Sequence, residues 1–275
     1  MKIRYILSLA SAIIFLNVCS AADPHWIYEE QADWGALESE DAGLVPPANY
    51  PYAECSIGRK QSPVDLIRAD ITQVTENKLK FEYTTNPLSI SNNGHTVKVN
   101  VANGNVKIGA TAYSLLQFHM HAPSEHTING HHYPLEIHFV HGTPDGKLAV
   151  VGVFAKIGGA NWALQKVLDN TPDTLQDVAP EGITFNPVDL VPAHSLPATS
   201  SFFTYSGSLT TPPCTEGVQW YVLKTPIEIS AEQLALYQEK YLAGANKAAA
   251  DAGLPSVSED GNRWVQPLNG RIVVK

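Results

Sequence analysis

The sequence predicts a mainly β protein that folds as a single domain, with a few helices at its periphery. Short apolar stretches alternate with turn residues, 19 glycines and 19 prolines are spread along the chain, and the best helical patterns cover only two segments. A chain of 275 residues is long enough for one large β-rich domain or for two small ones. Because neither composition nor motif spacing divides the chain, we expect one domain.

Residues 1–21 have the pattern of a secretory signal peptide. A short basic start is followed by an apolar run from Tyr5 to Val18 and by small residues, with cleavage expected near Ala21 or Ala22. The apolar run is too short, and wrongly flanked, for a transmembrane span. We therefore expect residues 22–275 to form the mature domain, in the periplasm or secreted.

The balance of charges argues against nucleic acid or an anionic membrane as the main partner. The formal net charge is -9, and removal of the first 21 residues, with Lys2 and Arg4, leaves 16 basic against 27 acidic side chains, or -11. A surface of this sign repels phosphate groups.

The cysteines predict a disulfide. Cleavage would remove Cys19 and leave Cys55 and Cys214, an even number in a protein exported to an oxidising compartment. Neither residue has the spacing of a metal site or a catalytic nucleophile. We do not expect lipidation at Cys19, because Val18 is larger than the residue that lipoprotein sites prefer.

The elements follow from local patterns. Residues 23–51 are irregular, with Trp26, Tyr28 and Trp34 as expected anchors. Asn103-Gly104 predicts a hairpin between two of the strands. Ser230 is the expected N-cap of the second helix. The expected strands are 78–83, 88–90, 96–101, 106–108, 117–121, 136–141, 148–155 and 217–223, with 148–155 buried on both faces, and the expected helices are 161–168 and 231–241.

Two of these strands predict a metal site. Side chains alternate between the two faces of a strand, so His119 and His121 lie on one face of 117–121. In the second strand, 136–141, His138 lies on one face and His141 on the other. His138 is therefore the natural third ligand. Neutral imidazole is a preferred ligand for Zn²⁺, and three protein ligands leave a fourth position open, as in catalytic zinc sites.

Gln117 and Glu136 share faces with these ligands. A ligating histidine usually donates its other ring N–H to an amide, a carboxylate or a carbonyl, which fixes its orientation. We expect Gln117 and Glu136 to accept such hydrogen bonds from the ligating histidines.

Seven motifs extend this interpretation over the chain from about Trp26 to Val273. They are His119-Met120-His121, Glu136-Ile137-His138, Gln61-Ser62-Pro63-Val64-Asp65, Asn92-Asn93-Gly94-His95, Ser124-Glu125-His126, Gly207-Ser208-Leu209-Thr210-Thr211-Pro212-Pro213 and Gln266-Pro267-Leu268-Asn269. Together, in this order, they resemble the α-class carbonic anhydrases. The placement of Cys55 and Cys214 resembles the disulfide of exported bacterial members.

The resemblance implies a fold and an activity. The fold would be a large, twisted, mostly antiparallel sheet with one Zn²⁺ at the base of a cone-shaped cleft. The activity would be the reversible hydration of CO₂ to bicarbonate and a proton, by attack of zinc-bound hydroxide, with weak ester hydrolysis as a side activity. The substrate would be a small molecule, and the protein a monomer or a homodimer.

The resemblance also implies the roles of individual residues. Thr210 would accept the proton of the hydroxide, and Glu125 would accept a hydrogen bond from Thr210. His95, beside the Gly94 turn, would carry protons to buffer, because histidine titrates near neutral pH.

The remaining roles concern the substrate and the water chain. CO₂ has neither charge nor hydrogen-bond donor, so its pocket should be apolar. The family's substrate pocket is matched by Val140, Val150, Leu209, Thr211 and Trp220, and the residues that order water toward His95 are matched by Tyr28, Asn93 and Thr211.

Lys98 departs from the family pattern, which usually has a neutral amide there. We expect its charge to depress the pKa of His95. Of the other histidines, we expect His126 within the core and His131 and His132 in a loop, and the sequence shows no partner for His25 or His194.

Two rival functions are a binding module without activity and a zinc hydrolase. The presence of all three ligands with Thr210, Glu125 and His95 argues against the first, and the absence of a His-Glu-x-x-His motif argues against the second.

Overall fold

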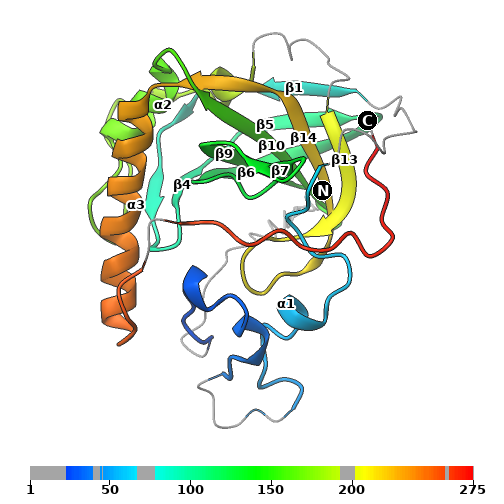
Figure 1. Ribbon diagram of the computed structural model, residues 1–275. Helices are drawn as coiled ribbons and strands as arrows, with labels where there is room; N and C mark the ends of the chain where they lie inside the picture. The colour runs from blue at the N-terminus through cyan, green and yellow to red at the C-terminus, as the bar shows by residue number, and fades with distance from the viewer. Residues whose placement is uncertain are drawn as a thin grey trace, which may run out of the picture.

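A ten-stranded sheet forms the centre of the molecule in the computed structural model, which describes residues 23–39, 44, 46–66, 78–192, 202–257 and 260–274 (Figure 1). The strand order is β11-β3-β4-β6-β9-β10-β14-β13, with β5 paired to β6 and β1 paired to β5. Among the described strands of this sheet, β10 and β14 form a parallel pair and the other pairs are antiparallel. The predicted mainly β, mostly antiparallel, single-domain fold is confirmed.

The elements have the following bounds. The strands are β1 (Leu79–Tyr83), β2 (Asn86–Pro87), β3 (Ile90–Asn92), β4 (Val97–Asn100), β5 (Gly104–Ile108), β6 (Thr111–His121), β7 (Thr127–Ile128), β8 (His131–His132), β9 (Leu135–Gly142), β10 (Leu148–Ile157), β11 (Gln176–Val178), β12 (Thr184–Phe185), β13 (Phe202–Ser208) and β14 (Glu216–Ile229). The helices are α1 (Glu54–Ile57), α2 (Trp162–Asp169) and α3 (Ala231–Asp251), with short 3-10 turns η1 (Tyr28–Glu30), η2 (Trp34–Ala36) and η3 (Pro187–Leu190).

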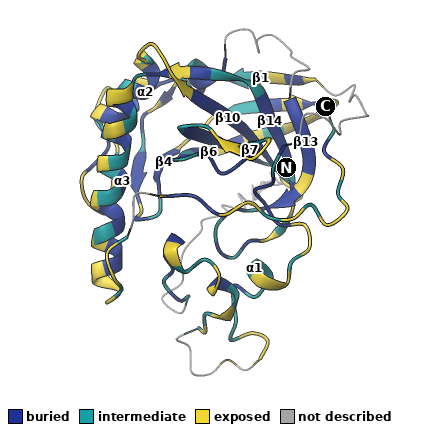
Figure 2. Ribbon diagram, in the orientation of Figure 1, coloured by how far each residue is buried: buried dark blue, intermediate teal, exposed yellow. Residues whose placement is uncertain are grey.

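The sheet is covered by hydrophobic side chains on both faces. Along β10, Val151 and Val153 belong to a larger cluster that also contains side chains of α2 and α3. Val150 and Phe154, which alternate with them, belong to a second cluster. The prediction that β10 is buried on both faces is therefore confirmed, and Figure 2 shows exposed positions concentrated on the outer side of α3 and near α1.

Local capping explains where both long helices begin. Asn161 accepts hydrogen bonds from the N–H groups of Ala163 and Leu164 at the start of α2. Ser230 and Gln233 form a capping box at the start of α3. The predicted helix starts are confirmed, but α3 continues ten residues beyond the expected end at Tyr241, to Asp251.

Two turn predictions are wrong. Strands β4 and β5, on either side of Asn103-Gly104, do not pair with each other, because each pairs with a different half of the long strand β6. The tight turn lies at Gly109, between β5 and β6. The loop expected at His131 and His132 is instead strand β8, paired with β7.

The amino-terminal segment packs under the sheet. Trp26, Tyr28 and Trp34, the expected anchors, form a buried cluster with Tyr52 and Cys214. The expected signal peptide, residues 1–21, and His194 lie outside the described residues. No helix in the described part of the chain combines the length and apolar character that a membrane span requires.

Candidate metal centre

The three predicted ligands come together on adjacent strands. His119 of β6 lies directly opposite His138 of β9, and His121 lies two residues further along β6 on the same face. One nitrogen of each of the three rings lies within 4.8 Å of the others. Phe118 and Met120, which alternate with them, point into the larger hydrophobic cluster and so fix the strand's orientation. The predicted grouping of His119, His121 and His138 is confirmed.

The second nitrogen of each ligand meets a fixed polar group. His119 Nδ1 lies 2.8 Å from Gln117 Oε1, and His138 Nε2 lies 3.0 Å from Glu136 Oε1. His121 Nδ1 lies 2.9 Å from the carbonyl oxygen of Gly261. The expected positions of Gln117 and Glu136 are confirmed, whereas Gly261 was not expected, because a backbone carbonyl leaves no trace in a sequence.

The donor set fits a zinc ion. His121 Nε2 is buried and has no hydrogen-bond partner among the described residues, which is costly for a polar atom unless a ligand binds it. Burial lowers the pKa of His121 and of His119, so both rings are neutral, the form that binds metals. Burial opposes the charged form of His138 too, but the Glu136 carboxylate outweighs it and raises the pKa. A second group, His126, Glu136 and His138, is also close enough to hold a metal, but His126 and Glu136 already bind each other.

Glu136 is the hub of a buried polar network. Its Oε2 accepts hydrogen bonds from the backbone N–H groups of Glu125 and His126, at 3.0 and 2.9 Å. Although its burial acts in the opposite direction, contact with His126 and His138 lowers the pKa of Glu136 well below its usual range. Gly152 faces His138 on β10, where a Cβ atom would come 2.8 Å from Glu136 Oε1. Glycine therefore leaves the space that this carboxylate occupies.

Glu125 and Thr210 are both buried, but the hydrogen bond expected between them is not formed. Glu125 Oε1 accepts from the backbone N–H of Arg263 at 2.8 Å. Its Oε2 has no hydrogen-bond partner among the described residues, and lies 3.5 Å from His121 Nε2 and 3.7 Å from His138 Nδ1. The carboxylate thus faces the metal ligands, which accounts for the missing contact with Thr210.

An apolar wall stands beside the ligands. Val140 of β9 lies opposite Val150 of β10, which in turn lies opposite Trp220 of β14. These three residues and the half-buried Leu209 belong to the smaller hydrophobic cluster. Four of the five residues expected to line the substrate pocket thus pack together, whereas the fifth, Thr211, is half-buried next to Thr210. Their role as a pocket stays a prediction.

His95 packs on the amino-terminal segment. Its ring stacks on Trp26 with centroids 3.7 Å apart and an interplanar angle of 9°. The ring of His25, for which the sequence showed no partner, lies 5.3 Å away. Burial, reinforced by the charge of His25, lowers the pKa of His95 to about 3. Lys98 is not among the causes of this shift. It lies opposite His119 and lowers the pKa of that ring instead, which corrects the expectation for Lys98.

Two residues expected to order water have distinct environments. Asn93 is exposed, and its Oδ1 accepts from the backbone N–H groups of His95 and Thr96, so that it closes the turn. Tyr28 is buried, and its hydroxyl has no hydrogen-bond partner in the described structure.

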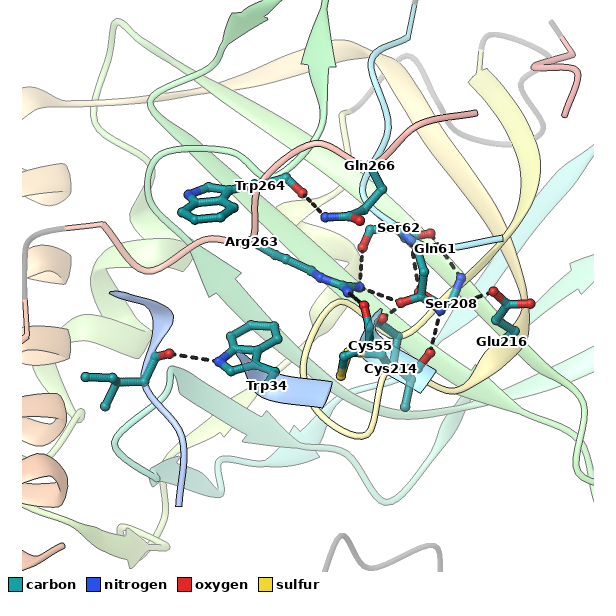
Figure 3. The surroundings of a disulfide bond; sticks show 12 residues. Trp34, Cys55, Gln61, Ser62, Ser208, Cys214, Glu216, Arg263, Trp264 and Gln266 are labelled. Carbon is teal, nitrogen blue, oxygen red and sulfur yellow. Dashed lines mark hydrogen bonds between the residues drawn. A yellow bond between two sulfur atoms is a disulfide. The ribbon is translucent and has the colours of Figure 1, made fainter. Parts of the chain in front are cut away.

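The predicted disulfide between Cys55 and Cys214 is formed (Figure 3). The two cysteines are 159 positions apart. Cys214 follows the segment with Thr210 and Thr211, so the disulfide ties that segment to the amino-terminal part of the chain.

Comparison with known proteins agrees with this arrangement. The model of the eukaryotic-type carbonic anhydrase family matches residues 47–275. A carbonic anhydrase from Nostoc sp. is 40% identical over 258 residues, which cover 88% of this chain and 86% of that protein. A carbonic anhydrase from Pectobacterium carotovorum is 36% identical over 275 residues, which cover 96% and 98%.

A solved structure has the same fold. The α-carbonic anhydrase from Thermovibrio ammonificans, in complex with the inhibitor sulfanilamide, superposes with a TM-score of 0.75 at 38% identity, over 92% of this chain and 99% of that one. Because the family model covers most of the sequence, and because relatives and structure agree over nearly the whole chain, this protein belongs to the eukaryotic-type, or α-class, carbonic anhydrases.

Proposed function

We propose that this enzyme catalyses the reversible hydration of CO₂ to bicarbonate and a proton at a single zinc ion held by His119, His121 and His138. The observation that carries the proposal is the convergence of three ring nitrogens within 4.8 Å, with the opposite nitrogen of each ring against a fixed polar group. Zinc, when bound, would lower the pKa of a water at its open position to roughly 7, for which carbonic anhydrase is the standard example.

Three groups of the chain orient the imidazoles. Gln117 Oε1 and the Gly261 carbonyl oxygen accept the ring N–H of His119 and His121, which fixes the tautomer that leaves Nε2 toward the metal. The Glu136 carboxylate lies 3.0 Å from Nε2 of His138, a contact that favours a proton on this nitrogen and would leave Nδ1 for the metal.

Glu125 and Thr210 would fix the direction of the reacting oxygen. Arg263 N–H holds one carboxylate oxygen of Glu125 and leaves Oε2 as an acceptor. If this carboxylate turned from the ligands toward Thr210, Oε2 would accept a hydrogen bond from the Thr210 hydroxyl group. Because the Thr210 hydroxyl would donate its own proton to this bond, Oγ1 could only accept. The reacting oxygen would donate its proton to Oγ1 and so present a lone pair to CO₂.

The apolar wall would hold CO₂ itself. Val140, Val150 and Trp220 offer no hydrogen bond, and a molecule without charge or donor loses little hydration when it binds there. Leu209 extends this surface to the residue before Thr210.

His95 would carry the proton to buffer. In the stacked position its pKa of about 3 is too low for efficient proton uptake near neutral pH. Transfer would therefore require the ring to leave Trp26 and become hydrated, which raises its pKa toward 6.5.

Export and side activity complete the proposal. Residues 1–21 would be removed as a signal peptide, residues 22–275 would act in the periplasm or outside the cell, and the disulfide fits an oxidising compartment. Weak ester hydrolysis would accompany the main reaction, because the same oxygen can attack an activated carbonyl.

Stopped-flow CO₂ hydration tests the function. Activity should vanish after removal of zinc with dipicolinate and return when one equivalent of zinc is added. His119→Ala should lose activity and zinc, whereas His131→Ala, an exposed histidine on β8, should lose neither. Hydration by the fully chelated protein would refute the proposal.

A second experiment tests the proton carrier. His95→Ala should slow turnover in weakly buffered solution and recover when imidazole is added, because a soluble base replaces the lost ring. Unchanged turnover in weak buffer would remove His95 from the mechanism.

A further inference from the structure

We infer that Arg263 is a positioning residue, which sets the Glu125 carboxylate against the segment that carries Thr210. The inference rests on the proposed function of these two residues and extends it. The backbone N–H of Arg263 donates to Glu125. Its side chain donates to Gln61 and Ser62, to which both ends of the segment that carries Thr210 are bonded (Figure 3).

The guanidinium is buried and donates three hydrogen bonds to uncharged oxygens. Arg263 is 2% exposed. Its Nη1 donates to Gln61 Oε1 at 2.8 Å and to the Ser62 carbonyl oxygen at 2.9 Å, and its Nη2 donates to the Cys55 carbonyl oxygen at 3.0 Å. The Trp34 ring lies 5.6 Å from the guanidinium carbon. The side chain is therefore fixed in one position by groups from different parts of the chain.

This fixed side chain determines where the backbone N–H of Arg263 points. That N–H donates to Glu125 Oε1 at 2.8 Å, and Glu125 is completely buried. The neighbouring backbone is also held, because Trp264 N–H donates to Gln31 Oε1 at 2.6 Å. The other carboxylate oxygen, Oε2, lies 3.5 Å from His121 Nε2 and 3.7 Å from His138 Nδ1, so the contact with Arg263 sets which groups Oε2 can face.

The same guanidinium reaches the Thr210 segment through Gln61 and Ser62. Ser62 N–H donates to Ser208 Oγ at 2.9 Å, and Ser208 N–H donates to Ser62 Oγ at 3.0 Å. Gln61 Nε2 donates to the Cys214 carbonyl oxygen at 3.0 Å. Thr210 lies between Ser208 and Cys214, so both ends of its segment are bonded to residues that Arg263 holds.

Charge adds to this geometry. Burial lowers the pKa of Arg263 to about 10, and the negative charge of Glu125 acts in the opposite direction. A buried cation without compensation costs several kcal/mol, so the carbonyl oxygens and the nearby carboxylate must both be in place for the charged side chain to stay inside.

Arg271 provides a matched control. It too donates to carbonyl oxygens, those of Leu268, Pro267, Ser206 and Gln61, and lies over an aromatic ring, that of Tyr205. Its contacts do not include Glu125. Arg271→Met therefore removes a similar set of hydrogen bonds, one of them to the Gln61 carbonyl oxygen, but leaves the contacts of Arg263 with Glu125 and with the Gln61 side chain in place.

The test compares Arg263→Met, Arg263→Lys and Arg271→Met in the zinc and Co²⁺ forms. We expect kcat/KM of Arg263→Met to fall about 100-fold, the loss that a displacement of about 1 Å produces. Zinc affinity, measured by competition with dipicolinate, should change less than about tenfold, because the groups that orient the ligands remain. The pH titration of the visible spectrum of the Co²⁺ form should move by about one unit, because Glu125 changes orientation.

The lysine variant keeps the inference testable if the methionine variant does not fold. An ammonium keeps the charge but cannot hold three acceptors in one plane, so Arg263→Lys should fold and still lose kcat/KM by about tenfold or more. Arg271→Met should lower thermal stability with kcat/KM close to that of the unmodified enzyme.

Three results would overturn the inference: wild-type kcat/KM in Arg263→Lys, an equal loss in Arg271→Met, or an unmoved Co²⁺ titration. Failure of the unmodified zinc enzyme to hydrate CO₂ would refute the proposed function instead. The spectrum of the Co²⁺ form would still report whether Arg263 controls the site.

Discussion

His141 makes acid stability a quantitative test of the structure. The residue is completely buried on β9, on the face opposite the metal ligands. Its Nε2 lies 2.7 Å from the Tyr83 hydroxyl and its Nδ1 lies 3.3 Å from the Ala149 carbonyl oxygen. Burial lowers its pKa from 6.5 to about 3, so the ring is neutral in the folded protein.

The sign of the effect follows from proton uptake. Between pH 6.5 and pH 3 the unfolded chain binds a proton at this ring and the folded chain does not, so the stabilisation is present above pH 6.5 and is lost as the pH falls through this window. At pH 5 this ring alone should lower the free energy of unfolding by about 2 kcal/mol relative to pH 7.

The assay is urea unfolding of the metal-free protein at pH 5, 6 and 7. The comparison variant is His141→Leu with Tyr83→Phe, which removes the titrating ring without leaving the tyrosine hydroxyl unpaired. The difference in unfolding free energy between the two proteins should change by about 2 kcal/mol between pH 7 and pH 5, because contributions of other histidines cancel. A difference that is the same at all three pH values would show that His141 is not held neutral.

Three further predictions concern the disulfide, the environment of His95 and the charge of Lys98. Replacing both Cys55 and Cys214 by alanine should lower the free energy of unfolding by about 5 kcal/mol, the chain-entropy value for a loop of this length, and a loss under about 1 kcal/mol in urea unfolding would contradict that reasoning. Trp26→Ala should raise the pKa of His95 toward 6.5, because the exposed ring becomes hydrated. NMR titration of the ring protons measures this pKa, and a value that stayed near 3 would contradict the prediction. Lys98→Gln should strengthen zinc binding several-fold in dipicolinate competition, because an ammonium near the metal centre repels a dication, and unchanged affinity would count against it.

The strand-borne part of the site was predictable because its rules are local. Alternation along two strands placed His119, His121 and His138 on one face, and their direct neighbours Gln117 and Glu136 on the same side. The same alternation placed His141 on the opposite face from His138, where the structure buries it completely.

The rest of the site depends on long-range contacts that have no local pattern. The partners of His121 and Glu125 are the backbone groups of Gly261 and Arg263, which lie more than a hundred residues away in sequence. The hairpin at Asn103-Gly104 failed for a related reason, because strand β6 is long enough to pair with β4 and β5 separately. Which strands pair with each other in such a case is decided by tertiary structure rather than by the residues of the turn.

The order of these segments along the chain has a consequence for biosynthesis. The three imidazoles of the candidate metal centre have all been synthesised once residue 138 is made, whereas the acceptor for His121 is added with residue 261 and the donor to Glu125 with residue 263. The ligands of the proposed zinc site are therefore complete in the chain long before the groups that would orient His121 and Glu125. On the proposed mechanism, activity would require the last part of the polypeptide to dock against the sheet.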